Sequence, residues 1–383
     1  MIFPIPYLVE VAILEICACI CAAPSATETN RKYSIFVAIT TFFVFFAFRG
    51  FIFSDWIIYY QYFYHCEWSD IFKYKIGSVV SFEPGFTILN LLCKNIANNY
   101  FFFQAVICFI NLILLLNFFK QRTNNIPLGL TLYFVFGGVE ISTNLLRNSI
   151  SIMLFLNALP YLKNRKIIPY FSLCLLGASF HSSALIYLPL YFFFHKKLNK
   201  WIFLVVVIIC NLIFLLKISV VLSVVNIIGL DQQFAEKLKA YTELFNKATP
   251  LSIGYIERLF TSILVFTYYK KIQSEEFTKD GAIIINAFLA YLIAFFFFSE
   301  FDTLSKRIGM LFIFSYWIIW KSLMDCFNNH NNRELFKAFV YFYCLIKIWS
   351  MTQLPSMEYD NILFGHKSYQ ERLMIFNRTF KEP

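Results

Sequence analysis

Charged residues are scarce in this 383-residue sequence, and their scarcity excludes a soluble protein. Asp, Glu, Lys and Arg make up 15% of the chain, whereas 59% of the residues are hydrophobic and 20% are aromatic. The mean hydropathy is +0.63. Soluble domains carry far more charge than this. Apolar runs recur almost without interruption from Ile2 to Met351, so we predict an all-α polytopic membrane protein with lipid as its solvent.

Sequence signatures of several other functions are absent. The chain has no Cys/His pairs with zinc-site spacing, no glycine-rich phosphate loop, no Gly-x-Ser-x-Gly elbow and no regular array of voltage-sensor arginines. The net charge of +10 comes from short basic clusters between apolar runs, which indicates membrane topology and not nucleic-acid binding. We therefore expect no metal, no cofactor and no nucleic-acid partner.

Apolar runs that are long enough to cross a membrane set the architecture. A helix needs about 20 apolar residues to cross the ~30 Å hydrocarbon layer. Runs of roughly this length occupy residues 2–23, 33–48, 100–119, 126–142, 145–162, 201–228, 252–269, 281–298, 307–325 and 335–352. No Lys or Arg precedes the first run, so we expect a retained span and not a signal peptide. These runs predict about 10–12 transmembrane helices in a single integral membrane domain over residues 1–383.

The basic clusters between the runs predict which loops face outward. Cytoplasmic loops attract Lys and Arg, and taking the clusters alternately places the N-terminus outside. Outer segments then include a loop at 49–99, a loop at 229–251 and the C-terminal tail at 353–383. The first loop contains an amphipathic segment at 86–97. Its aromatic residues suit an interfacial belt: Trp56, Tyr59, Tyr60, Tyr62 and Trp68.

Residues 167–194 are flanked by basic clusters at both ends, so this segment must enter the membrane and return. We predict two paired short helices that meet near His181. Each arm has about 13 residues and is about 20 Å long, too short to cross fully. His181 would then lie within the membrane, where broken backbone is tolerated only if protein or a wet cavity covers it.

Charged side chains near the outer ends of the spans are the functional candidates, because charge at membrane depth is costly and is retained for function. Arginine dominates the set. A guanidinium is permanently charged and grips phosphate oxygens through paired hydrogen bonds, so an anionic ligand such as lipid pyrophosphate fits better than a metal. The candidates are Arg49, Asp55, Glu83, Arg147, Arg258, Glu300, Lys306 and Arg307, with His181 as a titratable partner.

Each candidate also has a structural interpretation. Helical spacing puts Arg147 on one face with Asn144, Asn148 and Ser151, and such a polar stripe faces protein or water. An arginine near a helix end also reaches lipid headgroups, which leaves both interpretations open. The other structural alternatives are an interfacial anchor for Arg49, helix caps for Asp55 and Glu83, a satisfied structural histidine for His181, and a salt-bridged turn with Glu300 and Asp302 for Lys306 and Arg307.

Four short stretches carry a further signal through their order and spacing. They are Phe48-Arg49-Gly50 with Ser54-Asp55-Trp56 and Tyr59-Tyr60; Phe82-Glu83-Pro84-Gly85-Phe86; Leu145-Leu146-Arg147-Asn148-Ser149-Ile150; and Ser179-Phe180-His181-Ser182-Ser183. From about Tyr33 to Phe194 this pattern resembles the EpsG-like, Wzy-type polymerases of bacterial surface polysaccharides. Elsewhere the likeness is limited to hydropathy and to Lys306-Arg307 at the start of a late span. A frequent version of the first motif has glycine and Asp-Tyr where this chain has Ser54-Asp55-Trp56, which leaves the role of Asp55 open.

The resemblance implies a polymerase that joins undecaprenyl-pyrophosphate-linked oligosaccharide repeat units into O-antigen or capsule-type polysaccharide. It implies an active site on the periplasmic face of the bacterial inner membrane and an architecture like the GT-C class of glycosyltransferases. Membrane lipid and a chain-length regulator protein would be further partners. On this hypothesis pyrophosphate is bound by Arg147 and Arg307 with Arg49, Arg258 and Lys306, and the acceptor proton is taken by His181, or failing it Asp55 or Glu83.

Other functions remain open at this point. A flippase or transporter of lipid-linked oligosaccharide would also use arginines at membrane depth, although transporters often contain internal repeats, which this sequence lacks. An O-antigen ligase would transfer finished glycan to lipid A core. A membrane acyltransferase would have His181 as its one obvious base.

Overall fold

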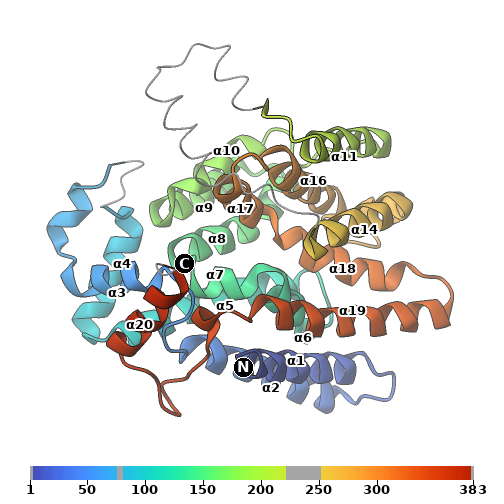
Figure 1. Ribbon diagram of the computed structural model, residues 1–383. Coiled ribbons are helices and arrows are strands. Elements are labelled where there is room, and N and C mark those ends of the chain that lie inside the picture. The colour runs from blue at the N-terminus through green and yellow to red at the C-terminus, as the bar shows by residue number, and fades with distance from the viewer. Residues whose placement is uncertain (1–2, 76–80, 221–251, 381–383) are drawn as a thin grey trace. The chain divides into compact units, whose positions relative to one another are not determined.

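The structure is a computed structural model that describes residues 3–75, 81–220 and 252–380 (Figure 1). Within these residues the secondary structure is helical, and extended pairing is limited to two isolated β-bridges that join Asn361 to Arg49 and to Gly365. The predicted all-α polytopic membrane fold is confirmed. The expected outer loop at 229–251 lies outside the described residues.

The described helices group into two compact units. The single integral membrane domain over residues 1–383 stays a prediction. Unit 1 comprises Met1–Phe193 and Glu334–Pro383, and unit 2 comprises Phe194–Arg333. The described helices of unit 2 are α11 (Lys200–Leu215), α14 (Ile253–Thr267), α15 (Tyr269–Gln273), α16 (Gly281–Phe297), α17 (Asp302–Phe312) and α18 (Phe314–Cys326).

Unit 1 contains the two ends of the chain and every stretch of the polymerase-like pattern. Its elements are α1 (Ile5–Ala22), α2 (Glu28–Ala47), α3 (Trp56–His65), η1 (Trp68–Phe72), α4 (Pro84–Ile96), α5 (Tyr100–Lys120), α6 (Ile126–Tyr133), η2 (Phe134–Gly138), α7 (Val139–Thr143), α8 (Leu146–Lys163), α9 (Ile167–Phe180), η3 (Ser182–Ile186), α10 (Tyr187–Leu190), α19 (His330–Met351, from Glu334 onward), η4 (Pro355–Met357) and α20 (Tyr369–Phe380).

Three described helices are long and apolar enough to cross a membrane by length and composition. They are Ile5–Ala22, Tyr100–Lys120 and Ile126–Thr143, and a fourth span arises if Leu304–Phe312 and Phe314–Cys326, bent by 53°, count as one. Helices α9, α11 and α16 are apolar but shorter. Most described helices follow the predicted apolar runs, but α11 ends at Leu215, inside the run 201–228, and the run 307–325 is divided between α17 and α18. The total of about 10–12 spans stays a prediction.

The polar stripe of α8 faces protein. Helix α8 packs against α5 and α9, and Asn148, Ser149 and Ser151 are at most 5% exposed. Asn111 on α5 donates a hydrogen bond of 2.7 Å to the Ser149 hydroxyl. A buried polar side chain is stable in such a place because a partner replaces its lost water. The stripe therefore belongs to the interior of unit 1.

Aromatic residues of the 49–99 segment form a core, which corrects the expected interfacial belt. Trp56 and Tyr59 are 4% and 5% exposed, and they pack with Phe63, Phe82 and Phe86. Burial of large rings stabilises this loop strongly, because each ring removes much apolar surface from solvent. Trp68, by contrast, is 51% exposed and keeps a position suited to an interface. The described part of the segment is thus a folded layer that shares its core with α5 and α8.

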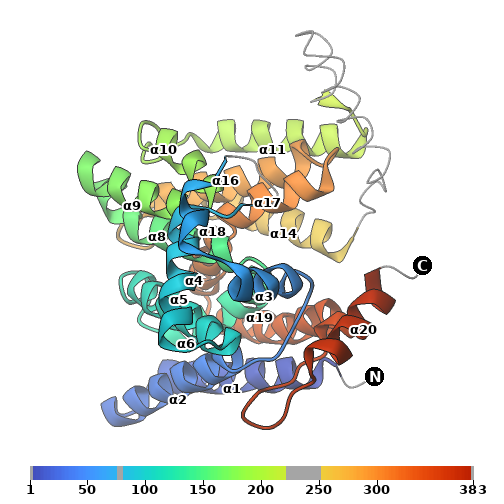
Figure 2. The ribbon, with the colours of Figure 1, turned by 90° about the vertical axis from the view of Figure 1, so that its left-hand side faces the viewer.

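The backbone breaks at His181, where the sequence predicted that two short helices meet. Helix α9 ends at Phe180, and His181 adopts an extended conformation with φ −155° and ψ 125°. The second arm is the 3-10 helix η3 followed by the single turn of α10. Helix α4 approaches this break closely (Figure 2). A Cβ atom on Gly85 would lie 2.4 Å from the Ser179 hydroxyl, so only glycine permits the approach.

Candidate functional site

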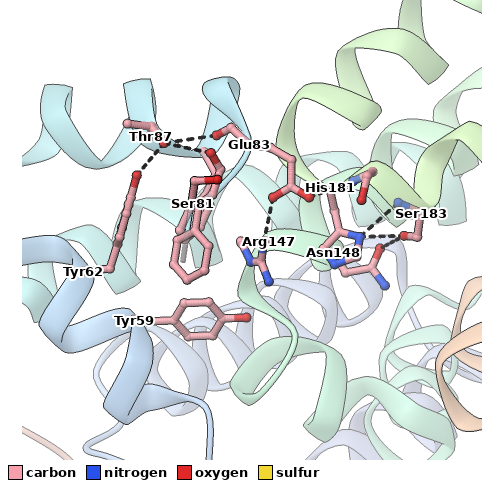
Figure 3. Close-up of polar contacts among 12 residues, drawn as sticks. Tyr59, Tyr62, Ser81, Glu83, Thr87, Arg147, Asn148, His181 and Ser183 are labelled. Atoms are coloured by element: carbon pink, nitrogen blue, oxygen red, sulfur yellow. Dashed lines mark hydrogen bonds and ion pairs between the residues drawn. The ribbon is translucent and has the colours of Figure 1, made fainter. Parts of the chain in front are cut away.

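Glu83 lies at the centre of a polar cluster in unit 1 (Figure 3). It is the residue before α4, which starts with Pro84, and it is 3% exposed. Its Oε2 atom accepts a hydrogen bond from Arg147 Nη1 at 2.7 Å, and its Oε1 atom accepts the backbone N–H of Ser182 at 2.9 Å. The carboxylate makes no cap hydrogen bond, so the expected capping role is wrong. Glu83 instead joins α4, α8 and the break after α9.

Arg147 occupies the first turn of α8, an unfavourable place for a cation. The amino-terminal end of a helix carries partial positive charge, which disfavours a guanidinium there. The carboxylate of Glu83 compensates, and the Phe82 ring lies 4.1 Å from the guanidinium carbon, a cation–π distance. The Arg147 side chain is 23% exposed, and its Nε atom has no hydrogen-bond partner among the described residues. The Nε atom is buried, so the accessible part of this side chain is its terminal nitrogens. Arg147 therefore binds protein, which excludes simple snorkelling to headgroups.

The protonation state of Glu83 follows from these contacts. Burial alone would raise the pKa of the Glu83 carboxyl, but the Arg147 guanidinium and the Ser182 backbone N–H outweigh burial. They hold the pKa below its ordinary value of 4.5. Glu83 is therefore a charged partner for Arg147 at neutral pH and a weak base.

His181 is oriented by a short polar chain that leads to α8. Its Nδ1 atom accepts the backbone N–H of Ser183 at 3.2 Å and lies 2.8 Å from the Ser183 hydroxyl oxygen. That hydroxyl donates a hydrogen bond of 3.0 Å to Oδ1 of Asn148 (Figure 3). When Nδ1 accepts a hydrogen bond, a neutral imidazole carries its proton on Nε2. His181 is thus oriented by Ser183, whose hydroxyl is held by Asn148 on α8.

Asp55 and its neighbours contact Asn144, which lies three residues before Arg147. The Oδ1 atom of Asn144 accepts the Asp55 backbone N–H at 2.9 Å and lies 3.0 Å from the Ser54 hydroxyl. The Tyr59 hydroxyl donates to the Asn144 carbonyl at 3.2 Å. Asp55 makes no side-chain cap hydrogen bond, although it sits at the start of α3. These contacts bring the first stretch of the pattern beside Arg147.

Arg49 has a different environment from Arg147. Arg49 is 2% exposed, and its Nη1 atom donates to the Phe46 carbonyl. The backbone carbonyl of Arg49 accepts a hydrogen bond of 2.8 Å from the Gln104 side chain. Arg49, Gln104 and Asn111 line a cavity of about 10 Å³, which is room for about one water molecule. A diphosphate does not fit there. Arg49 is neither an interfacial anchor nor accessible to lipid pyrophosphate in this structure.

The remaining predicted cations belong to unit 2. Arg258 donates from Nε to the Tyr291 hydroxyl at 3.0 Å and from Nη1 to the Gly254 carbonyl at 2.7 Å, and it lies 3.6 Å from the centre of the Phe295 ring. Lys306 and Arg307 are exposed on α17. The structure thus brings together Glu83, Arg147, His181 and Asp55 within unit 1, whereas Arg258, Lys306 and Arg307 belong to unit 2.

Several buried charged residues of unit 1 were not predicted from the sequence. Glu10 and Glu15 lie inside the first span and are 5% and 8% exposed. Their position within an apolar run is a sequence feature that could have identified them as functional candidates. Arg372 in the C-terminal tail is 2% exposed. It gave no signal, because a charged residue in a polar amphipathic segment usually lies in solvent.

The chain matches the model of one protein family over most of its length. This is the EpsG family, and the match covers residues 32–363. No curated protein and no solved structure matches the chain. The matched range includes all four stretches of the cluster around Glu83.

Proposed function

The chain belongs to the EpsG family, and on this basis we propose that it is a polysaccharide polymerase that joins lipid-linked oligosaccharide repeat units. The substrates are undecaprenyl-pyrophosphate-linked oligosaccharides, and the product is a polysaccharide of the O-antigen or capsule type. The enzyme is a GT-C-like glycosyltransferase of the bacterial inner membrane. Its active site faces the periplasm, and a chain-length regulator protein is a further partner.

The observation that carries this proposal is the contact of Glu83 with Arg147 beside the break at His181. Three stretches that lie far apart in the sequence meet there, and the carboxylate holds the guanidinium by one nitrogen. The Nε atom is buried and the Tyr59 hydroxyl also contacts the guanidinium, so the part of this 23% exposed side chain that is left for a ligand is its terminal nitrogens. A planar, permanently charged fork suits a diphosphate better than a carbonyl or a neutral sugar.

The reaction assigns a role to each group. A hydroxyl of the incoming lipid-linked unit attacks the anomeric carbon of the growing glycan; the new glycosidic C–O bond forms as the bond from that carbon to the pyrophosphate oxygen breaks. Arg147 stabilises the negative charge that develops on the leaving pyrophosphate, and one such donor is worth about 10²–10³ in rate.

The acceptor proton passes to His181. The imidazole acts as the general base for this proton, and the backbone N–H and hydroxyl of Ser183 orient the ring. Imidazole suits this step because its pKa lies near neutrality. Glu83 is unsuited because its ion pair lowers its basicity, and Asp55 is the second candidate. Arg258, Lys306 and Arg307 stay candidates for the other diphosphate, because donor and acceptor lipid each carry one.

Purified full-length protein incubated with lipid-linked repeat units tests the proposal. Longer glycans on the same lipid carrier support a polymerase. Transfer of glycan to a different acceptor would identify a ligase instead. Movement of the substrate between leaflets of a vesicle without new bonds would identify a flippase.

A further inference from the structure

The C-terminal tail folds back onto the beginning of the 49–99 segment. The backbone N–H of Gly50 donates to the Asp360 carbonyl at 2.9 Å, and the N–H of Ile362 donates to the Phe48 carbonyl at 2.8 Å. A third backbone bond of 2.9 Å runs from Phe53 to Ser356. These contacts pair two segments that lie about 310 residues apart in the chain. The tail is therefore an integral part of unit 1.

A buried arginine fixes the tail in this position. Arg372 on α20 is 2% exposed; its Nη2 atom lies 2.8 Å from Oδ2 of Asp360, and its Nη1 atom lies 3.8 Å from Oε2 of Glu358. Lys367 pairs with Glu358, and its backbone N–H donates to Oδ2 of Asp360 at 2.8 Å. Two carboxylates thus face two cations. Removal of Arg372 would leave the carboxylates of a partly buried network without their deepest counterion.

The tail contacts the 50–60 region so closely that one glycine is required. A Cβ atom on Gly50 would lie 1.9 Å from Oδ1 of Asp360. On α20, the Tyr369 ring stacks on Tyr60 with centroids 4.7 Å apart and meets the Trp56 ring edge-on at 5.4 Å. Gln61 donates to the Tyr369 hydroxyl at 3.2 Å. One face of α3 is therefore covered by α20.

The other side of the same region holds the approach to Arg147. Ser54, Asp55 and Tyr59 contact Asn144, which precedes Arg147 by three residues. Helix α8 has no side-chain cap at its amino terminus, and these contacts help to fix the turn that leads into it. A continuous set of contacts therefore runs from Arg372 through the 50–60 region to Arg147. The family match ends at residue 363, so Arg372 and α20 lie beyond it.

We propose that Arg372 is a positioning residue of the polymerase. It locks the tail, residues 355–380, against residues 50–60, and through Asn144 it holds Arg147 where the diphosphate is bound. Its effect on catalysis rests on the proposed function, whereas its effect on the backbone does not.

Full-length protein with Arg372→Ala tests this role, with Arg378→Ala as the matched control because Arg378 is exposed on the same helix. In Arg372→Ala the hydrogen–deuterium exchange rate would rise roughly tenfold at residues 50–60 and at 144–149, because the contacts that hold these segments in place are weakened. Glycan chain growth in cells would fall about 10²-fold at unchanged protein abundance, since a shift of ~1 Å at a reacting group costs about that much. Arg372→Lys would recover part of the amide protection and part of the chain growth, and Arg378→Ala would change neither quantity.

The outcomes separate the two claims. Faster exchange confined to residues 366–380 would overturn the positioning role, and so would faster exchange at 144–149 with normal glycan. If the natural protein makes no glycan, the proposed function fails, while exchange at 144–149 still decides whether Arg372 holds that turn. Should Arg372→Ala not accumulate, Arg372→Lys tests the same position, and normal exchange at 144–149 with normal glycan would overturn the requirement for a guanidinium. Tyr369→Ala removes a separate contact of the tail with Tyr60, so it should loosen residues 50–60 without stranding a charge.

Discussion

Replacing Arg147 with lysine or alanine separates its structural role from its catalytic role. Both variants remove the planar donor fork, but lysine keeps a positive charge for the Glu83 carboxylate. If the residue serves only to neutralise Glu83, lysine restores stability and activity together. If it also binds diphosphate, lysine restores stability alone.

The magnitudes follow from the environment of the pair. The Glu83 and Arg147 side chains are 4% and 23% exposed, and their charged atoms are 2.7 Å apart. Removing one partner of a buried pair costs about 3–5 kcal/mol, and the partial exposure of Arg147 places alanine near ~3 kcal/mol. Lysine recovers most of this and should lose about 1 kcal/mol. Chain growth should fall about 10²–10³-fold in alanine and at least about tenfold in lysine.

Two assays measured on the same preparations check this. Thermal unfolding of the purified protein reports stability, and the length distribution of surface glycan in cells reports chain growth at matched abundance. Arg378→Lys is the control, because that arginine is exposed and lies outside the cluster. A lysine variant with both normal stability and normal glycan length would refute the diphosphate role of Arg147.

Three further predictions follow from the same unit. Because the pKa of Glu83 is lowered, the stability from its ion pair is fully present above pH 4.5 and is lost as the pH falls through the lowered value; thermal unfolding across this range should show that loss, and Glu83→Gln should lack it. His181→Ala should reduce chain growth about 10²-fold without loss of protein, measured as glycan length against abundance, and normal glycan would exclude it as the base. Gly50→Ala should destabilise by about 2 kcal/mol or more because its Cβ would overlap the Asp360 carboxylate, whereas Gly309→Ala, with 3.6 Å of clearance, should unfold like the natural protein.

The helices were predictable because each depends on a property of a continuous run. The run 145–162 corresponds to α8 at Leu146–Lys163, and the run 281–298 corresponds to α16 at Gly281–Phe297. Length and hydropathy suffice for such elements, since lipid rewards any apolar stretch that is long enough. The break at His181 followed from the same reasoning, because basic clusters on both sides required the segment to return.

The pairings between distant residues were not predictable. Glu83 was expected to cap α4, and its carboxylate instead pairs with Arg147, 64 residues away. Periodicity tells which residues share a face but not which face of another helix they meet. Arg49 illustrates the same limit, because its sequence signal matched that of Arg147 while the tail and α5 bury it. No local feature of the sequence indicates the contacts of the tail with residues 48–53.

The most direct test of the account is the affinity of the protein for undecaprenyl pyrophosphate without sugar. Binding to the natural protein, Arg147→Lys and Arg147→Ala would be measured in detergent by native mass spectrometry, with undecaprenol as the uncharged competitor. We expect the diphosphate lipid to bind the natural protein at least about tenfold more tightly than either variant, a difference of ~1.4 kcal/mol, and undecaprenol to bind all three alike. Equal affinity of the diphosphate lipid for all three proteins would contradict the claim that Arg147 recognises it.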